Sequence, residues 1–243
     1  MGQADSVVII GHQGLGDHIV CSGLYREYAR KYSKCVLPVN KRNYRSVKEL
    51  LKDVPNIQVI SEGTRLRALQ IESHALLLEK VGYDLLALGR YKSDFYALEN
   101  KRFDEKFYDQ AKIDFEHRWK SFSLVRNYRR EDELFEILVG DRKPYVFVHD
   151  DHSRNFGINE KYLPKKYAVV RPDIRLGGKY YFTDYLKIIE NAAEIHCMES
   201  SFAALIESCE IDRPKFAHRY IRSESKIGMH YEFTYKSFWE VLT

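Results

Sequence analysis

Short runs of β-branched residues alternate with helical stretches along this chain, and this alternation limits the folds it can adopt. Residues 6–10 (SVVII) have the pattern of a buried strand that ends at Gly11, and a helical stretch covers 19–32. The alternation continues with strands expected over 35–39, 57–60 and 83–88, and helices over 44–52 and 66–81. Strands that alternate with helices are typical of βαβ units. We therefore expect a parallel sheet in the N-terminal part.

The alternation stops over residues 91–138 and then begins again. That stretch is aromatic and charged and has no β-rich run, which predicts helices that cap the first sheet. After residue 140, strands are expected over 145–149, 167–171, 194–198 and 215–220, and helices over 185–191, 202–208 and 233–242. The sequence thus predicts an α/β protein of two domains facing a cleft. We expect them to comprise residues 1–140, joined by a closing helix at 233–243, and residues 141–232.

The composition excludes several classes of protein. The 243 residues are 44% hydrophobic and 30% charged, with 13 Gly and 6 Pro, which is typical of globular proteins and not of disordered or collagen-like chains. The 39 basic and 35 acidic residues leave a net charge of +4, too small to indicate a nucleic-acid partner. We therefore expect no nucleic acid among the partners.

Three further features bear on the cellular location. No run approaches the ~18 consecutive apolar residues that a membrane helix needs, and residues 1–6 lack the basic start of a signal peptide. The four cysteines, at 21, 35, 197 and 209, show no CxxC spacing. They are expected to be reduced thiols, without a zinc site or disulfides. These features favour a cytoplasmic protein without a transmembrane segment.

A glycine-rich turn, GHQGLGD at 11–17, follows the first expected strand. Its spacing matches neither the dinucleotide nor the P-loop fingerprint, but its glycines allow a ligand to approach N–H groups at a helix start. Asp17 falls near the first helical position, where it is either an ordinary helix cap or a general base at the carboxyl edge of the sheet. His12 and His18 flank it and are expected to be polar residues of the cleft.

A second turn of this kind lies in AEIHCMESSFAAL at 193–205. Ser200 and Ser201 either cap the following helix or form an anion site with its free N–H groups. Two such turns, one in each half of the chain, form a more specific pattern than either turn alone.

The two turns resemble those of GT-B glycosyltransferases, particularly the heptosyltransferase type, over about forty residues. GHQGLGDHIVCSGLYREYA resembles the opening of that family, and AEIHCMESSFAALIES resembles its donor-site turn. The resemblance implies two Rossmann-like domains, with a nucleotide-diphosphate sugar held by the C-terminal one and a glycan acceptor by the N-terminal one. It also implies transfer without a metal or cofactor, with Asp17 as the catalytic carboxylate. Glu199 and Ser201 depart from the Asp and Gly usual in the family, so the donor sugar stays open.

Inverting transfer needs a base for the acceptor hydroxyl and donors for the departing diphosphate. Arg154 is the favoured basic residue because arginine grips phosphates in a bidentate manner, and Arg171 is a second candidate. The residues expected to contact the donor are Gly14, Gly16, His149, Ser153, Arg154, Arg171, Glu199, Ser200 and Ser201. The residues expected on the acceptor side are His12, His18, His117 and Arg118.

The run from His149 to His152 (HDDH) superficially resembles a metal site. Adjacent residues of an extended chain point to alternate sides, so four of them rarely converge on one ion. The run is more consistent with a loop that touches the donor nucleotide, and we expect no metal.

The predicted function is therefore transfer of a sugar from a donor such as a UDP- or GDP-sugar to a glycan hydroxyl. The sugar could be a deoxyhexose such as L-rhamnose or L-fucose, a pentose or a hexose. Three alternatives remain: a non-catalytic nucleotide- or glycan-binding module, a nucleotide-sugar epimerase and a nucleic-acid-binding protein. The Lys- and Tyr-rich composition resembles that of proteins from large DNA viruses of algae; a bacterial source and an origin as one domain of a larger polypeptide stay open.

Overall fold

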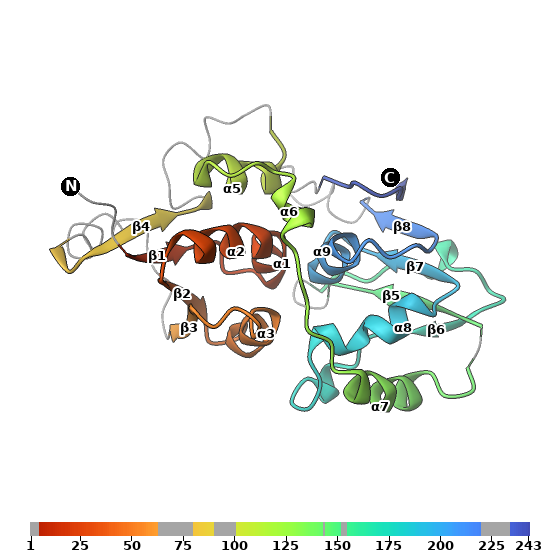
Figure 1. The fold of residues 1–243 in the computed structure, drawn as a ribbon. Coiled ribbons are helices and arrows are strands. Elements are labelled where there is room, and N and C mark those ends of the chain that lie inside the picture. The colour runs from red at the N-terminus through yellow and green to blue at the C-terminus, as the bar shows by residue number, and fades with distance from the viewer. Residues whose placement is uncertain (1–4, 63–79, 90–100, 143, 152–154, 220–233) are drawn as a thin grey trace. The chain divides into compact units, whose positions relative to one another are not determined.

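The computed structural model describes residues 5–62, 80–89, 101–142, 144–151, 155–219 and 234–243. The chain forms two compact units, residues 1–125 (unit 1) and 126–243 (unit 2), and each is described by itself. Each unit contains one parallel sheet with helices packed beside it (Figure 1). The predicted α/β class and both parallel sheets are confirmed.

Unit 1 is built on a four-stranded parallel sheet with the order β3-β2-β1-β4. The strands are β1 (Ser6–Ile10), β2 (Lys34–Asn40), β3 (Ile57–Glu62) and β4 (Tyr83–Ala87). The helices are α1 (Leu15–Val20), α2 (Ser22–Lys31), α3 (Tyr44–Leu50), α5 (Phe103–Ala111) and α6 (His117–Lys120). All four strands expected in this region are confirmed. The helix expected over 66–81 lies almost entirely outside the described residues.

The central strand β1 is apolar on both faces, as a strand covered on both sides must be. Val7 and Ile9 are almost completely buried, and Val8 and Ile10 pack in a second cluster with Val36 of β2 among others. Val8 lies beside Val36 on one side and Leu85 on the other in the strand register. The β-branched run at 6–10 therefore forms the middle of the sheet.

The strand order of unit 1 creates one special position on its carboxyl edge. The chain steps outward from β1 to β2 and β3 and then returns to the other side of β1 as β4. The direction of the strand order therefore reverses between β1 and β4. In open α/β sheets, ligands bind in the crevice at such a topological switch point.

Unit 2 contains a five-stranded parallel sheet with the order β6-β5-β7-β8-β9. Its strands are β5 (Tyr145–His149), β6 (Ala168–Val170), β7 (Glu194–Cys197), β8 (Lys215–His218) and β9 (Glu240–Leu242). Its helices are α7 (Tyr128–Leu138), η4 (Glu160–Tyr162), η5 (Ile174–Leu176), η6 (Phe182–Tyr185), α8 (Leu186–Glu190) and α9 (Ser201–Ser208). The order reverses after β6, so the switch point of unit 2 lies between β5 and β7.

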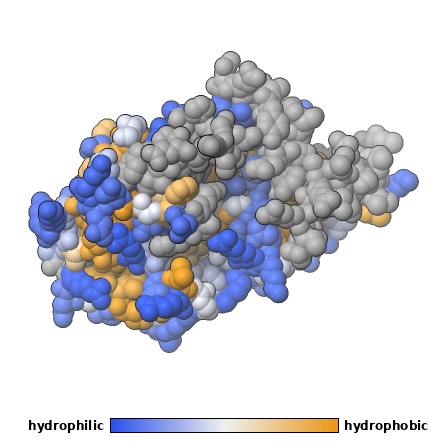
Figure 2. Space-filling model, turned by 180° about the vertical axis from the view of Figure 1, so that it is seen from behind, coloured by the Kyte–Doolittle hydropathy of each residue, from blue (hydrophilic) through white to orange (hydrophobic). Residues whose placement is uncertain are grey.

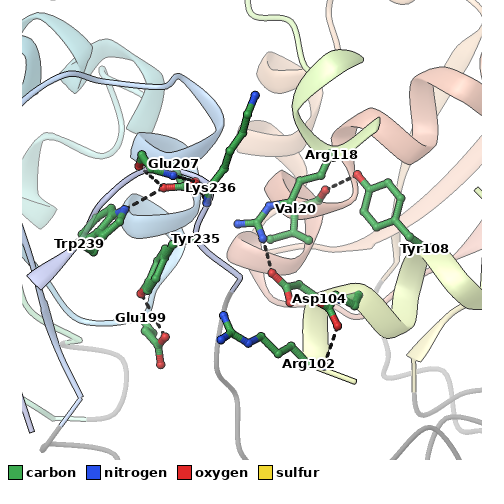
Figure 3. Close-up of polar contacts among 12 residues, drawn as sticks. Val20, Arg102, Asp104, Tyr108, Arg118, Glu199, Glu207, Tyr235, Lys236 and Trp239 are labelled. Carbon is green, nitrogen blue, oxygen red and sulfur yellow. Dashed lines mark hydrogen bonds and ion pairs between the residues drawn. The ribbon is translucent and has the colours of Figure 1, made fainter. Parts of the chain in front are cut away.

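The helix expected over 233–242 is wrong. Residues 234–243 contain no helix, and Glu240–Leu242 forms β9, which pairs in parallel with β8. The reason is tertiary: the buried carboxylate of Glu207 on α9 accepts hydrogen bonds from the backbone N–H of Lys236 (2.6 Å) and from the indole of Trp239 (2.8 Å) (Figure 3). These bonds hold the segment extended, and they outweigh its amphipathic pattern.

The division between the units falls at Val125, whereas the sequence suggested a boundary near residue 140. Helix α7 (Tyr128–Leu138) and residues 234–243 both belong to unit 2. In unit 2, Arg126 joins the α7 residue Glu131 to Glu190 on α8 through its guanidinium. This contact explains why the chain joins unit 2 at residue 126.

The described surface bears no sign of a membrane span. Hydrophilic residues are spread over the face drawn in Figure 2, with hydrophobic residues among them. Among the helices in the described ranges, none combines the length and the apolar character needed to cross a bilayer. All four cysteines are free thiols.

Candidate functional site

The turn after β1 places Asp17 at the switch point of unit 1. Gly14 is the N-cap of α1, and Asp17 lies in the first turn of that helix. A Cβ atom on Gly14 would lie 2.7 Å from Asp17 Oδ2, so the carboxylate that folds over the helix start would have to shift if Gly14 were replaced. The side chain of Asp17 remains 21% exposed. It is therefore a solvent-accessible carboxylate at a sheet edge where ligands commonly bind.

A polar network fixes the path of this turn. The carbonyl of Gln13 accepts hydrogen bonds from the side-chain amides of Asn40 (2.7 Å) and Asn43 (2.6 Å). The Gln13 side chain accepts from the backbone N–H of Asn40 (2.6 Å) and donates to the carbonyl of Gly11 (3.0 Å). Because Asn40 ends β2, these bonds tie the turn to the neighbouring strand. Nothing in the local sequence pattern marked Gln13, Asn40 or Asn43.

His12 lies beside Asp17, with its Nδ1 3.6 Å from Asp17 Oδ2. His18, by contrast, is completely buried, and its Nδ1 lies 3.1 Å from the hydroxyl of Tyr25. Burial lowers the pKa of His18 to about 4, so the ring is neutral near pH 7. The structure thus brings His12 to Asp17 and places His18 in the core.

The two residues expected on the acceptor side from the later helices lie on α6. Arg118 is entirely buried and pairs with the buried carboxylate of Asp104 on α5 (Figure 3). His117 is partly exposed, and its Nδ1 lies 3.0 Å from Glu27 and 2.8 Å from the hydroxyl of Ser121. The Arg118 guanidinium stabilises the packing of α5 against α6, which leaves it poorly placed to touch a substrate.

In unit 2, the switch point brings together two residues that the sequence singled out. His149 ends β5 and Ser200 is the N-cap of α9, and the Nδ1 of His149 lies 2.7 Å from the Ser200 hydroxyl. The His149 ring also packs on Phe202, with 4.5 Å between ring centroids. No side-chain hydrogen bond caps α9, so Ser200 is not the ordinary cap that one interpretation expected. Ser201 opens the helix beside it.

A buried carboxylate positions Arg171 at the same edge. Asp150 accepts a hydrogen bond from the backbone N–H of Ile158 (2.7 Å) on one oxygen and from Arg171 Nε (2.9 Å) on the other. Asp150 is almost completely buried, while the Arg171 side chain is partly exposed. A guanidinium held through Nε can present its other nitrogens to an anion.

Glu199 is held by two residues that sequence reasoning missed. Its Oε1 accepts hydrogen bonds from Arg219 (3.0 Å from NH2) and from the hydroxyl of Tyr235 (3.1 Å) (Figure 3). Burial, followed by the Glu199 charge, raises the pKa of Tyr235 well above its ordinary value. Arg219 comes directly after β8, just as Arg171 comes directly after β6. An arginine at the end of a strand was therefore the sequence signal that could have identified Arg219.

Among the expected donor contacts of unit 2, the structure gathers His149, Arg171, Glu199, Ser200 and Ser201 at one sheet edge. Gly14 and Gly16 lie in unit 1 at the start of α1. Ser153 and Arg154 lie outside the described residues. Within the part of the chain that the structure describes, no three His, Cys, Asp or Glu side chains are grouped to hold a metal ion.

No protein-family model matches this sequence, and no curated protein does. Solved structures do resemble it. A glycosyl transferase of family 9 from Veillonella parvula superposes with a TM-score of 0.54 at 8% identity, over 100% of this chain and 87% of that one. The iron-containing dodecameric glycosyltransferase TibC from enterotoxigenic E. coli gives a TM-score of 0.51 at 10% identity, over 97% of this chain.

This chain spans only 62% of TibC, less than two thirds of its length. At such low identity the similarity concerns the fold alone. The chain therefore shares its α/β architecture with glycosyltransferases of family 9.

Proposed function

We propose that this chain is a glycosyltransferase that moves a sugar from a nucleotide-diphosphate donor to a hydroxyl of a glycan acceptor. The observation that carries the proposal is the partly exposed Asp17 carboxylate at the switch point of unit 1. The fold shared with family 9 and the resemblance of the two turns to that superfamily support it.

Asp17 is the proposed general base. Its carboxylate takes the proton of the acceptor hydroxyl as that oxygen attacks the anomeric carbon of the donor sugar. The bond between the anomeric carbon and the diphosphate oxygen breaks, and the electron pair leaves with the nucleoside diphosphate. Attack from the face opposite the leaving group inverts the anomeric configuration.

The leaving diphosphate is assigned to unit 2. Arg171, held by Asp150, supplies a positive charge, and the N-terminus of α9 supplies N–H groups beside Ser200 and Ser201. His149 contacts Ser200 and fixes its hydroxyl. These groups neutralise developing negative charge, so the proposed transfer needs no metal.

The identities of the donor sugar and of its nucleotide are also proposals. A deoxyhexose such as L-rhamnose or L-fucose is the favoured sugar, and UDP or GDP the favoured nucleotide. The cytoplasm is the proposed compartment, since nucleotide sugars are the proposed substrates.

A thermal-shift panel tests the proposal. UDP-, GDP-, ADP- and dTDP-sugars are added in millimolar excess to the full chain with EDTA present. At ~100 times Kd, a bound donor should add about 2.7 kcal/mol of stability, which corresponds to a rise in Tm of roughly 5–10 °C. The stabilising donor should then release its nucleoside diphosphate on incubation with the protein.

The other outcomes of this panel identify the alternative functions. Binding without any release or transfer would identify the non-catalytic module, and conversion of the donor sugar alone would identify an epimerase. If no nucleotide sugar shifts the Tm, the proposal is wrong.

A further inference from the structure

We propose that His12 is a positioning residue that holds and electrostatically supports Asp17, rather than a contact to the acceptor. The inference rests on the proposed function for its catalytic meaning, but its structural part can be tested without turnover. Three observations carry it: the socket around the imidazole, the helix face that closes the socket, and the direction in which Nδ1 points.

The socket is built around the loop after β4. Gly89 has φ +68°, and a Cβ there would lie 2.2 Å from His12 Cδ2 and 2.3 Å from its Nε2. Any residue other than glycine at position 89 would therefore collide with the His12 ring and displace it. The Gly89 backbone is itself fixed, because Gln110 accepts from its N–H (2.6 Å) and donates to its carbonyl (3.3 Å).

One face of α5 closes the socket. Phe103 and Phe107 each lie 5.2 Å from the His12 ring between centroids, and they contact each other at 4.9 Å. Together with Gln110 they occupy positions i, i+4 and i+7 of the helix, which share one side. The opposite side is anchored in unit 1 by Tyr108, whose hydroxyl donates to the carbonyl of Val20 (2.8 Å). Helix α5 is therefore a rigid wall for His12.

The imidazole is too buried to serve as an outer contact. His12 is 7% exposed, whereas the Asp17 side chain is 21% exposed. The ring therefore lies behind the carboxylate, with Nδ1 toward Oδ2 at an ion-pair distance of 3.6 Å. Contacts of this kind are often long in a free enzyme and shorten when substrate binds.

The contacts of the ring favour this role. The wall of α5 contributes Phe103, Phe107 and Gln110, none of which is charged. His18, which follows Asp17 on α1, is neutral near pH 7 because burial lowers its pKa. The geometry places the Asp17 carboxylate against Nδ1 of His12, where an N–H on that nitrogen stabilises the carboxylate.

The first test needs no substrate. Ring resonances of the ¹⁵N-histidine-labelled full chain are recorded at one pH, and those of His12 are identified by their loss in His12→Gln. In Asp17→Asn the Nδ1 resonance of His12 should move, because the carboxylate oxygen 3.6 Å from that nitrogen has gone. An unchanged Nδ1 resonance would overturn the proposal, whether or not the chain transfers sugar.

The second test uses a matched pair of glycines. Gly89→Ala strains a positive φ and drives a Cβ into His12, whereas Gly82→Ala strains a positive φ (+81°) with nothing within 4 Å. With the donor found in the thermal-shift panel, Gly89→Ala and His12→Gln should each lower kcat by roughly 10- to 100-fold and leave KM for the donor nearly unchanged.

Gly82→Ala should match the wild type in both quantities. An unchanged kcat in a folded His12→Gln variant would contradict the positioning role. A moved His12 resonance in Asp17→Asn, without turnover in the wild type, would retain the contact and reject the proposed function instead.

Discussion

The two switch points have the same topology but opposite chemistry. In unit 1 the turn carries glycines, and Gly14 makes room for the carboxylate of Asp17 over the start of α1. In unit 2 the turn after β7 carries Glu199, Ser200 and Ser201, and the Ser200 hydroxyl and the Arg171 guanidinium at this edge can act as donors. One edge therefore suits proton abstraction and the other suits an anion. The difference shows that function resides in the groups placed on a fold and not in the fold itself.

The residues behind each switch point differ in the same way. His12 supports Asp17 from a socket of aromatic rings, whereas Asp150 holds Arg171 by a direct hydrogen bond. In each unit a buried polar group lies behind a more accessible one. Loss of the His12–Asp17 pair should therefore lower kcat, whereas loss of the Asp150–Arg171 pair should weaken binding of the donor.

The largest expected effect comes from removing the base. Asp17→Asn keeps the shape of the turn but removes the carboxylate, so kcat should fall by about 10²- to 10⁴-fold while the donor Kd changes little. Product formation and calorimetric donor binding measure the two quantities. Glu116→Gln, at a side chain that is 52% exposed, is a control that should leave both unchanged. Turnover at the wild-type rate in Asp17→Asn would exclude Asp17 as the base.

The next effect concerns the buried acid of unit 2. Glu207→Ala leaves the indole N–H of Trp239 and the hydroxyl and backbone N–H of Ser237 without their acceptor. The free energy of unfolding should fall by roughly 3 kcal/mol, since buried donors without partners are costly. Urea denaturation measures this.

The control for that variant is a surface pair of the same unit. Asp132 pairs with Lys187 at 2.6 Å near the solvent, and Asp132→Ala should cost less than about 0.5 kcal/mol. Equal losses in the two variants would show that Glu207 does not anchor the C-terminal segment.

Acid should weaken both units through buried histidines. Burial lowers the pKa of His18 in unit 1 and of His218 in unit 2 to about 4 each. Because the unfolded chain binds these protons near its ordinary pKa of about 6.5, stability is full above that pH and is lost as pH falls toward 4. From His18 alone the loss should reach about 2 kcal/mol at pH 5.

Unfolding free energies at pH 7 and pH 5 test this in the wild type, His18→Leu and His218→Leu. The quantity compared is the unfolding free energy at pH 7 minus that at pH 5, and not the absolute stability of each variant. That difference should shrink in each variant. If both variants lose as much stability between pH 7 and pH 5 as the wild type does, other groups cause the acid sensitivity.

The smallest expected effect concerns donor binding at unit 2. Arg171→Ala removes a positive charge at the sheet edge and should weaken binding of the nucleoside diphosphate roughly tenfold, about 1.4 kcal/mol. Arg175→Ala is the matched control, because Arg175 is exposed and pairs with its neighbour Asp173. Equal effects of the two substitutions would point to general charge rather than to a built site.

The comparison also shows which features could be predicted from sequence. Local sequence predicted every strand before residue 219, most clearly the β-branched runs of β1 (SVVII) and β5 (YVFVH). The strand orders, and with them the switch points, depend on long-range pairing that periodicity does not encode. The C-terminal helix was predicted wrongly because Glu207, some thirty positions earlier in the sequence, holds that segment extended.

Within the sites, both turns were found but their partners were not. Gly89, Phe107 and Gln110 reach His12 only through the fold. His18 is instructive, because adjacent residues on a helix do not face the same direction. Asp17 and His18 could therefore not both face one site, and the structure buries the second.

Hydrogen exchange of the full chain, with and without the nucleoside diphosphate that shifts Tm most, tests the division of labour most directly. Protection should concentrate at residues 149–151 and 198–204 of unit 2 and leave 11–18 of unit 1 nearly unchanged. Protection confined to residues 11–18 would contradict the account, because it would place the nucleotide on the turn assigned to the base.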